Sequence, residues 1–255
     1  MKSIILAALL SLAWITAPLA QIDPAKGPAA KKAATTFLTI SKDASKTGTP
    51  PREQDASIRE LLDAVFDTGD IDAAKTISFQ ALTPLSERIS IGMQVATVYM
   101  LAGTGVAELG QLGNVENGSE KVNINTVQFA PEMGRYLDFQ VKIQTAITDA
   151  VLTRLATAKP DELSRPKFQS GIENIRGGSA GIVSGVIEVL ALNGLTEEWR
   201  RARLPALMKA APSLAKFLNA TQKAELQQLA INCADVMDDA SVKAALQEFS
   251  KIVLP

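Results

Sequence analysis

Histidine is absent from the 255-residue sequence, and cysteine occurs only once, at Cys233. Without histidine the chain lacks the one side chain that titrates near neutral pH unperturbed, and with it the common zinc, haem and Ser-His-Asp sites. A single cysteine cannot form a disulfide within the chain. The fold must therefore be stabilised by apolar packing, and an enzyme built on this chain would have to use carboxylates, lysine or tyrosine.

The sequence also lacks an excess of charge of either sign. It has 26 basic and 27 acidic side chains, a formal net charge of −1, and only 5% aromatic residues. Nucleic-acid binding needs a concentrated surplus of lysine and arginine to neutralise phosphates. We therefore expect no nucleic-acid partner, and we assign no cofactor and no metal site.

The first twenty residues have the pattern of a secretory signal peptide. Lys2 gives a positive start, residues 4–15 form an apolar run, and Ala20 is a small residue before Gln21. The run is too short for an ordinary membrane span of about 20 residues. The sequence therefore predicts export to the periplasm or the extracellular space, with cleavage near Ala20.

Helical spacing of apolar residues dominates from residue 28 to the end, and period-two alternation occurs only at 122–126. This pattern predicts an all-α fold, an irregular bundle of about seven or eight helices. The polar stretch 41–57 contains Pro50-Pro51 and is interpreted as a linker that ends a flexible N-terminal segment, 21–57. The remaining residues, 58–255, are expected to form one helical domain, with a surface loop at 112–128 as a possible subdivision.

Local signals place several helix ends. Ser57 and Glu60 have capping-box spacing and predict a helix over 58–67. An apolar stripe at helical spacing predicts a helix from Pro131 to Ala158. The last two helices are expected to form an antiparallel pair, the first capped at 219–222 and the second entered through the turn at 238–241.

Two nearly uncharged segments carry glycine. Residues 89–107 contain no charged side chain, and residues 177–194 contain only Glu188. Gly177, Gly181 and Gly185 recur every four residues, so they share a helix face within an arc of about 80°. Because glycine costs about 1 kcal/mol relative to alanine inside a helix, a compensating close contact is expected. We predict that the two segments form a central glycine-rich helix pair.

This pair has two interpretations. It is either buried inside a water-soluble bundle or inserted into a membrane, as small-xxx-small helices can be. Gln94 and Glu188 would be costly in lipid, and the second apolar run is shorter than about 20 residues. The soluble bundle is therefore favoured, and membrane association is kept as the alternative.

Glu188 extends the glycine face and is the one charged residue within 177–194. If it were buried without a cation, desolvation would raise its pKa and suit it to acid, base or ligand-binding chemistry. A rim position, or pairing with Arg88 or Arg135, is the favoured interpretation. Gly177, Gly181, Gly185 and Glu188 thus form a candidate binding or packing face, and no catalytic residue is assigned.

Residues 199–203, Trp-Arg-Arg-Ala-Arg, follow a helix cap at Thr196. They are suited to contact anionic lipid or an acidic partner, but a solvated helix face with Trp199 turned inward is favoured. Pro205 and Pro212 are expected to break or restart this helix.

A cluster of acids and the single thiol lie near the C-terminus. Asp235, Asp238 and Asp239 lack the glycine and the glutamate of a calcium loop, so they are interpreted as helix-capping residues. Cys233 belongs to an apolar stripe and is expected to be a buried core residue.

No motif in the sequence identifies a family or a reaction. We predict an exported, all-helical, non-enzymatic binding or interaction module, with an unknown protein or small-molecule partner in the cell envelope. A membrane-active protein is the first alternative, and a carboxylate-dependent hydrolase is the second.

Overall fold

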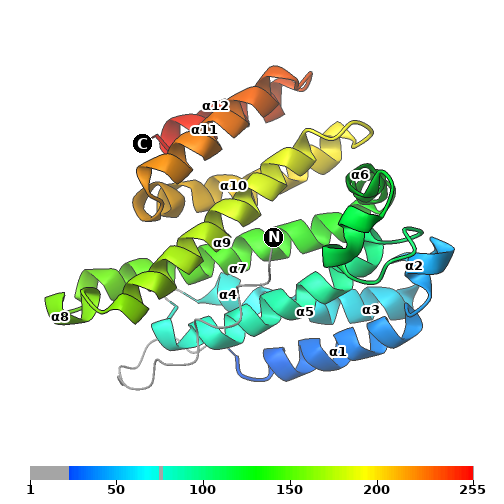
Figure 1. The fold of residues 1–255 in the computed structure, drawn as a ribbon, viewed down its shortest axis with the longest axis horizontal. Helices are drawn as coiled ribbons and strands as arrows, with labels where there is room; N and C mark the ends of the chain where they lie inside the picture. The colour runs from blue at the N-terminus through cyan, green and yellow to red at the C-terminus, as the bar shows by residue number, and fades with distance from the viewer. Residues whose placement is uncertain (1–22, 75–76, 255) are drawn as a thin grey trace.

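The computed structural model describes residues 23–74 and 77–254 (Figure 1). All regular structure in these residues is helical, which confirms the all-α prediction. The predicted signal peptide lies outside the described residues.

The described chain contains twelve α-helices and two 3-10 helices. In chain order they are α1 (Lys26–Ile40), α2 (Ala44–Thr47), α3 (Ala56–Val65), α4 (Gly69–Ala73), η1 (Phe79–Ala81), α5 (Leu82–Met100), η2 (Leu109–Asn114), α6 (Gly118–Gln128), α7 (Ala130–Thr157), α8 (Pro160–Leu163), α9 (Pro166–Leu190), α10 (Glu197–Phe217), α11 (Ala220–Asp235) and α12 (Ala240–Ile252). Three of them, α2, α4 and α8, are four or five residues long. The predicted count of seven or eight was too low because such short helices have no measurable apolar period.

The 28-residue helix α7 is the centre of the fold. The N-terminal helices α1, α3 and α5 lie on one side of it and α9 to α12 on the other, as Figure 1 shows. The predicted helix from 131 to 158 is thereby confirmed, and Ile143 and Val151 of its apolar stripe are fully buried. More than one stripe is buried, including Leu137 and Val141, because α7 is covered from both sides.

Helix α1 is part of the core and not a separate polar segment. Ala30, Ala33, Ala34 and Phe37 are buried where α1 packs against α3 and α5. Residues 21–57 were predicted to be flexible because the segment is rich in alanine and lysine and has few large apolar side chains. Alanine at helical spacing nevertheless gives α1 a face that other helices can approach closely.

The segment expected to be a linker, 41–57, is a packed connection. The N–H of Gly103 donates to the carbonyl of Ala44 at 3.1 Å, and that of Gly105 donates to Ser45 at 2.8 Å. Gly48 and Gly103 lie backbone to backbone, and both have a positive φ, which favours glycine over residues with a side chain. These contacts hold α2 against the end of α5.

The surface loop predicted at 112–128 is wrong. The 3-10 helix η2 and the α-helix α6 occupy most of this stretch, including the alternating residues 122–126. The side-chain amide of Asn125 donates to the carbonyls of Met100 and Ala102, at 2.9 and 2.8 Å, and so caps α5. This tertiary contact stabilises a helix whose sequence is too polar to be predicted locally.

The predicted central glycine-rich pair is also wrong. Helix α5 begins at Leu82 and ends at Met100, seven residues before each end of the uncharged segment. Helices α5 and α9 both pack against α7, and Gly92 of α5 faces Phe139 of α7. The sequence marks helix faces that allow close approach, but it does not say which helix covers them.

Helix α10 continues through both prolines, contrary to the prediction. Pro205 and Pro212 are exposed, so the carbonyls that lose an amide donor can bond to water on the solvent side.

Three of the helix starts follow their predicted caps and one does not; the Thr196 hydroxyl accepts from the N–H of Trp199 at the start of α10. The cap of α11 is the predicted box of Asn219 and Gln222, and Asp239 caps α12, which lies antiparallel to α11. Helix α3 begins earlier than predicted, because Asp55 and not Ser57 is its cap.

Candidate functional site

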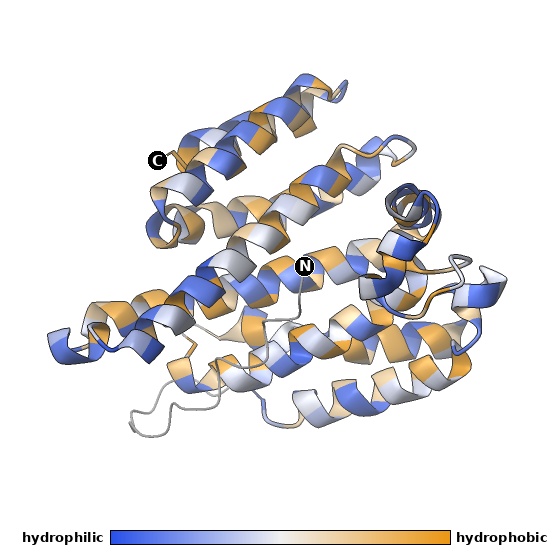
Figure 2. Cartoon of the chain, viewed as in Figure 1, coloured by the Kyte–Doolittle hydropathy of each residue, from blue (hydrophilic) through white to orange (hydrophobic). Residues whose placement is uncertain are grey.

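The predicted glycine face lies on the open side of α9. Gly177 and Gly181 are exposed, and a Cβ atom added at Gly177, Gly178, Gly181 or Gly185 would meet no other atom within 4 Å. The middle of α9 is correspondingly pale in Figure 2, between its more strongly coloured ends. The predicted residues therefore share one face, but nothing in the described part of the chain covers it.

Glu188 is exposed at one end of this face. Its two suggested partners are engaged elsewhere: Arg88 pairs with Asp70, and Arg135 pairs with Glu53 and Asp63. Among residues 23–74 and 77–254 no cation forms an ion pair with Glu188, which makes it a rim residue.

The basic cluster of α10 is used inside the fold. The indole N–H of Trp199 donates to the carbonyl of Ala130 at 2.6 Å, and Arg203 pairs with Asp138 at 2.9 Å while lying over the Trp199 ring. Arg200 donates to the carbonyls at the end of α9, and Arg201 pairs with Asp239 at 2.7 Å. These side chains tie α10 to α7, α9 and α12 and do not form a free cationic patch.

Of the three C-terminal acids predicted to cap helices, Asp239 caps α12, whereas Asp235 is the last residue of α11 and Asp238 lies in the turn before α12; the predicted burial of the thiol is confirmed. Asp239 accepts hydrogen bonds from the N–H groups of Ser241 and Val242, which together with Arg201 hold its pKa below the usual value despite burial. Cys233 is buried, and burial, helped by the charge of Glu188, raises the pKa of its thiol. Within the described residues no three side chains are arranged to hold a metal ion.

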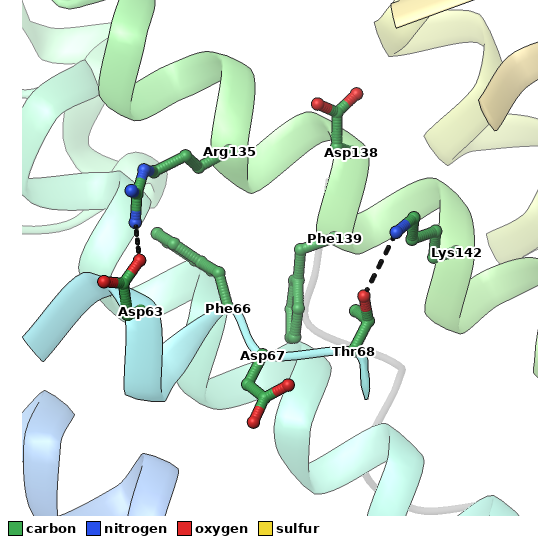
Figure 3. A pocket seen from close by; sticks show the side chains of 8 residues that line it. All are labelled: Asp63, Phe66, Asp67, Thr68, Arg135, Asp138, Phe139 and Lys142. Atoms are coloured by element: carbon green, nitrogen blue, oxygen red, sulfur yellow. Dashed lines mark hydrogen bonds and ion pairs between the residues drawn. The ribbon is translucent and has the colours of Figure 1, made fainter. Parts of the chain in front are cut away.

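A polar cleft that the sequence did not predict lies between α7 and the segment joining α3 to α4 (Figure 3). Its volume is about 460 Å³. The lining consists of Asp63, Phe66, Asp67, Thr68, Arg135, Asp138, Phe139 and Lys142. Phe66 and Phe139 meet edge to face, with ring centres 5.4 Å apart, and form the apolar floor.

Ion pairs surround this floor. Arg135 reaches Glu53 at 2.9 Å and Asp63 at 2.5 Å, at one end of the cleft. At the other end Lys142 donates to Asp72 at 2.8 Å and to Thr68 at 3.3 Å. Each end of the cleft thus carries both a positive and a negative side chain, and the two phenyl rings lie between the ends.

Two of the acids near the cleft have lowered pKa values. The hydrogen bond from Lys26 holds the pKa of Asp67 below its usual value. Burial opposes ionisation of Asp72, but the hydrogen bond and the charge of Lys142 outweigh it and lower the pKa. Both carboxylates are therefore charged at neutral pH.

A buried carboxylate fixes the chain beside the cleft. The Glu132 side chain is fully buried, and its Oε1 accepts from the Arg52 guanidinium at 2.9 Å and from the Glu53 N–H at 3.0 Å. The Tyr99 hydroxyl donates to the Pro51 carbonyl at 2.9 Å, and burial raises the pKa of that hydroxyl. Residues 51–53 are thereby held against α5 and α7, which positions Glu53 to pair with Arg135.

A second hollow of about 480 Å³ lies between the end of α1 and the start of α3. Its charged lining residues include Asp55, which caps α3, and Arg52, which pairs with Glu132. Both side chains therefore have structural partners.

One signal of the cleft was present in the sequence. Arg135 and Lys142 are seven residues apart and share a helix face, and four aspartates occur between residues 63 and 72. Because some 70 residues separate the two groups, only the tertiary fold shows that they meet.

In the described part of the chain, no helix has the length and apolar character needed to cross a membrane. No family model, no curated protein and no solved structure matches this chain, so what it does must be argued from its own residues.

Proposed function

We propose that this chain is an exported, non-enzymatic interaction module that binds a helix of a partner protein through the open face of α9. The face is defined by Gly177, Gly181, Gly185 and Glu188. The observation that carries the proposal is the empty space over these glycines, where a Cβ atom would meet nothing within 4 Å.

The glycines of α9 are unfavourable for the isolated chain. Each destabilises a helix interior by about 1 kcal/mol relative to alanine, and here no contact within the described chain offsets that loss. A smooth helix surface without side chains lets a second backbone approach closely, which is how glycine faces stabilise helix pairs. A partner helix would therefore supply the missing compensation.

The other parts of the proposal rest on the sequence. Export rests on the apolar run 4–15 and on the small residue Ala20. The non-enzymatic interpretation rests on the lack of histidine and the single cysteine, which remove the usual acid, base and nucleophile sets.

Site-specific photo-crosslinking in the producing cell tests the proposal. A photoreactive side chain is placed at Gly181, and in a second protein at the exposed Glu225 of α11 as a matched control. We expect a discrete adduct from position 181 in the envelope fraction and none from position 225. The mass of the recovered chain also reports whether cleavage occurs after Ala20.

Four results would count against the proposal. Equal adducts from both positions, or none from 181 and its neighbours 177 and 185, would remove the case for this face. Flotation of the mature chain with anionic vesicles, without a protein adduct, would favour the membrane-active alternative. Turnover of a glycoside that is lost on replacing cleft carboxylates would favour the hydrolase.

A further inference from the structure

We propose that the cleft beside α7 is a binding site for a short apolar peptide with free termini, held extended between Asp63 and Lys142. The peptide ammonium pairs with Asp63, its carboxylate pairs with Lys142, and a central apolar side chain covers Phe66. This inference is independent of the α9 face and concerns a small ligand and not a protein partner.

The rise of α7 between Arg135 and Lys142 indicates how long the peptide should be. Arg135, which holds Asp63, and Lys142 are seven residues apart on α7, and two helical turns separate such residues by about 10.5 Å. Three extended residues span about 10 Å. A free amino acid is much shorter than this rise, whereas an extended tripeptide has about the same length.

Asp63 has hydrogen-bonding capacity to spare. Its Oδ1 pairs with Arg135, its Oδ2 has no partner among the described residues, and the side chain is 59% exposed. Arg135 is held independently by Glu53. An ammonium group can therefore bind Asp63 without releasing the arginine.

Lys142 has the complementary capacity. An ammonium group carries three donors, and Thr68 and Asp72 occupy two of them. The side chain is 36% exposed, so a carboxylate can approach the third. A peptide carboxylate would thus add a charge-assisted hydrogen bond without breaking an existing one.

The floor between these groups is apolar. Phe66 is half-buried, and Phe139 supports it from below at an edge-to-face angle. Figure 3 shows the carboxylates of Asp67 and Asp138 turned away from the two rings, and these acids pair with Lys26 and Arg203. The volume of about 460 Å³ lies within the range of small-ligand sites.

Calorimetric titration of the mature chain with the peptide Ala-Phe-Ala tests the site. We expect saturable binding, weakened about tenfold by acetylating the amino terminus and about tenfold by amidating the carboxyl terminus, as for the loss of one charge-assisted hydrogen bond. Lys142→Met should weaken the free peptide about tenfold but leave the affinity for the amidated peptide unchanged. Asp63→Asn should show the same selectivity toward the acetylated peptide.

The matched controls are Lys167→Met and Asp161→Asn, which change exposed residues outside the cleft and should leave binding unchanged. Because the peptide series uses the unaltered protein, a folding defect in a variant does not prevent a decision. Absence of saturable binding at millimolar peptide, or equal affinity for free and blocked peptides, would overturn the proposal. Replacing Gly181 should not affect this titration, so the two proposals can fail separately.

Discussion

Gly92 on α5 and Gly181 on α9 lie in similar sequences but in opposite surroundings. A Cβ atom on Gly92 would lie 2.6 Å from Cε1 of Phe139, whereas one on Gly181 would meet nothing within 4 Å. The first glycine lets α5 approach α7 around a buried phenyl ring. The second leaves a smooth helix surface that the chain itself does not use.

The difference shows that a glycine-bearing, uncharged segment has no fixed meaning. In α5 the close approach is internal, and the stability of the fold depends on it. In α9 the same composition weakens the helix, and no close contact within the described chain offsets that loss. Substitutions at the two positions should therefore change stability in opposite directions.

The largest effect is expected from Gly92→Ala. The new methyl group would overlap the Phe139 ring, which is 1% exposed and has little room to move. Overpacking of a core contact destabilises a protein by about 1–3 kcal/mol. Urea unfolding at neutral pH measures this loss.

A smaller side chain at position 139 provides the control for Gly92→Ala. Phe139→Leu should destabilise the unaltered protein but destabilise it less in the Gly92→Ala background, because the clash is removed. Additive losses in this double-mutant cycle would show that the two residues are not coupled in the way the structure indicates.

The opposite sign is expected from Gly181→Ala. Since the site is open and α-helical, alanine should raise the free energy of unfolding by up to about 1 kcal/mol through its helix propensity. Gly177→Ala is a second test of the same surface. Destabilisation by either change would mean that the face is covered, and the contrast with Gly92 would be lost.

The smallest effect is expected at the contact between α4 and α7, where Asp72 pairs with Lys142. The lowered pKa of Asp72 means that its charged form stabilises the folded state at pH values above about 3.9, its value in an unfolded chain. This contribution is lost as the pH falls through the lower pKa of the folded state. The free energy of unfolding should therefore decline below about pH 4.

Asp72→Asn is the matched variant for this pH dependence. It should be slightly less stable than the unaltered protein at pH 7 and should lose less stability between pH 5 and pH 3. Parallel curves for the two proteins over that interval would show that the pair with Lys142 contributes nothing measurable, as many exposed ion pairs do.

Much of the secondary structure could be predicted from local sequence. The long helix over α7, the paired helices α11 and α12, the box at Asn219 and Gln222, and the burial of Cys233 all follow from apolar period and capping chemistry. Helix α6 could not be predicted, because Asn125 acts on carbonyl groups more than twenty residues away.

For the candidate site on α9, the sequence likewise predicted the local arrangement but not the tertiary contact. The sequence placed Gly177, Gly181, Gly185 and Glu188 on one face, because four-residue spacing fixes direction around a helix. The prediction that α5 packs against this face was wrong.

By itself the sequence determined that the described chain is helical and which residues share a face, because helical periodicity and capping act within a few residues. Only the tertiary structure decided that α7 covers Gly92, that the α9 face stays open, and that Asp63 meets Arg135. Those outcomes depend on which apolar surfaces pack together over long sequence separations, and packing of the whole chain sets that choice.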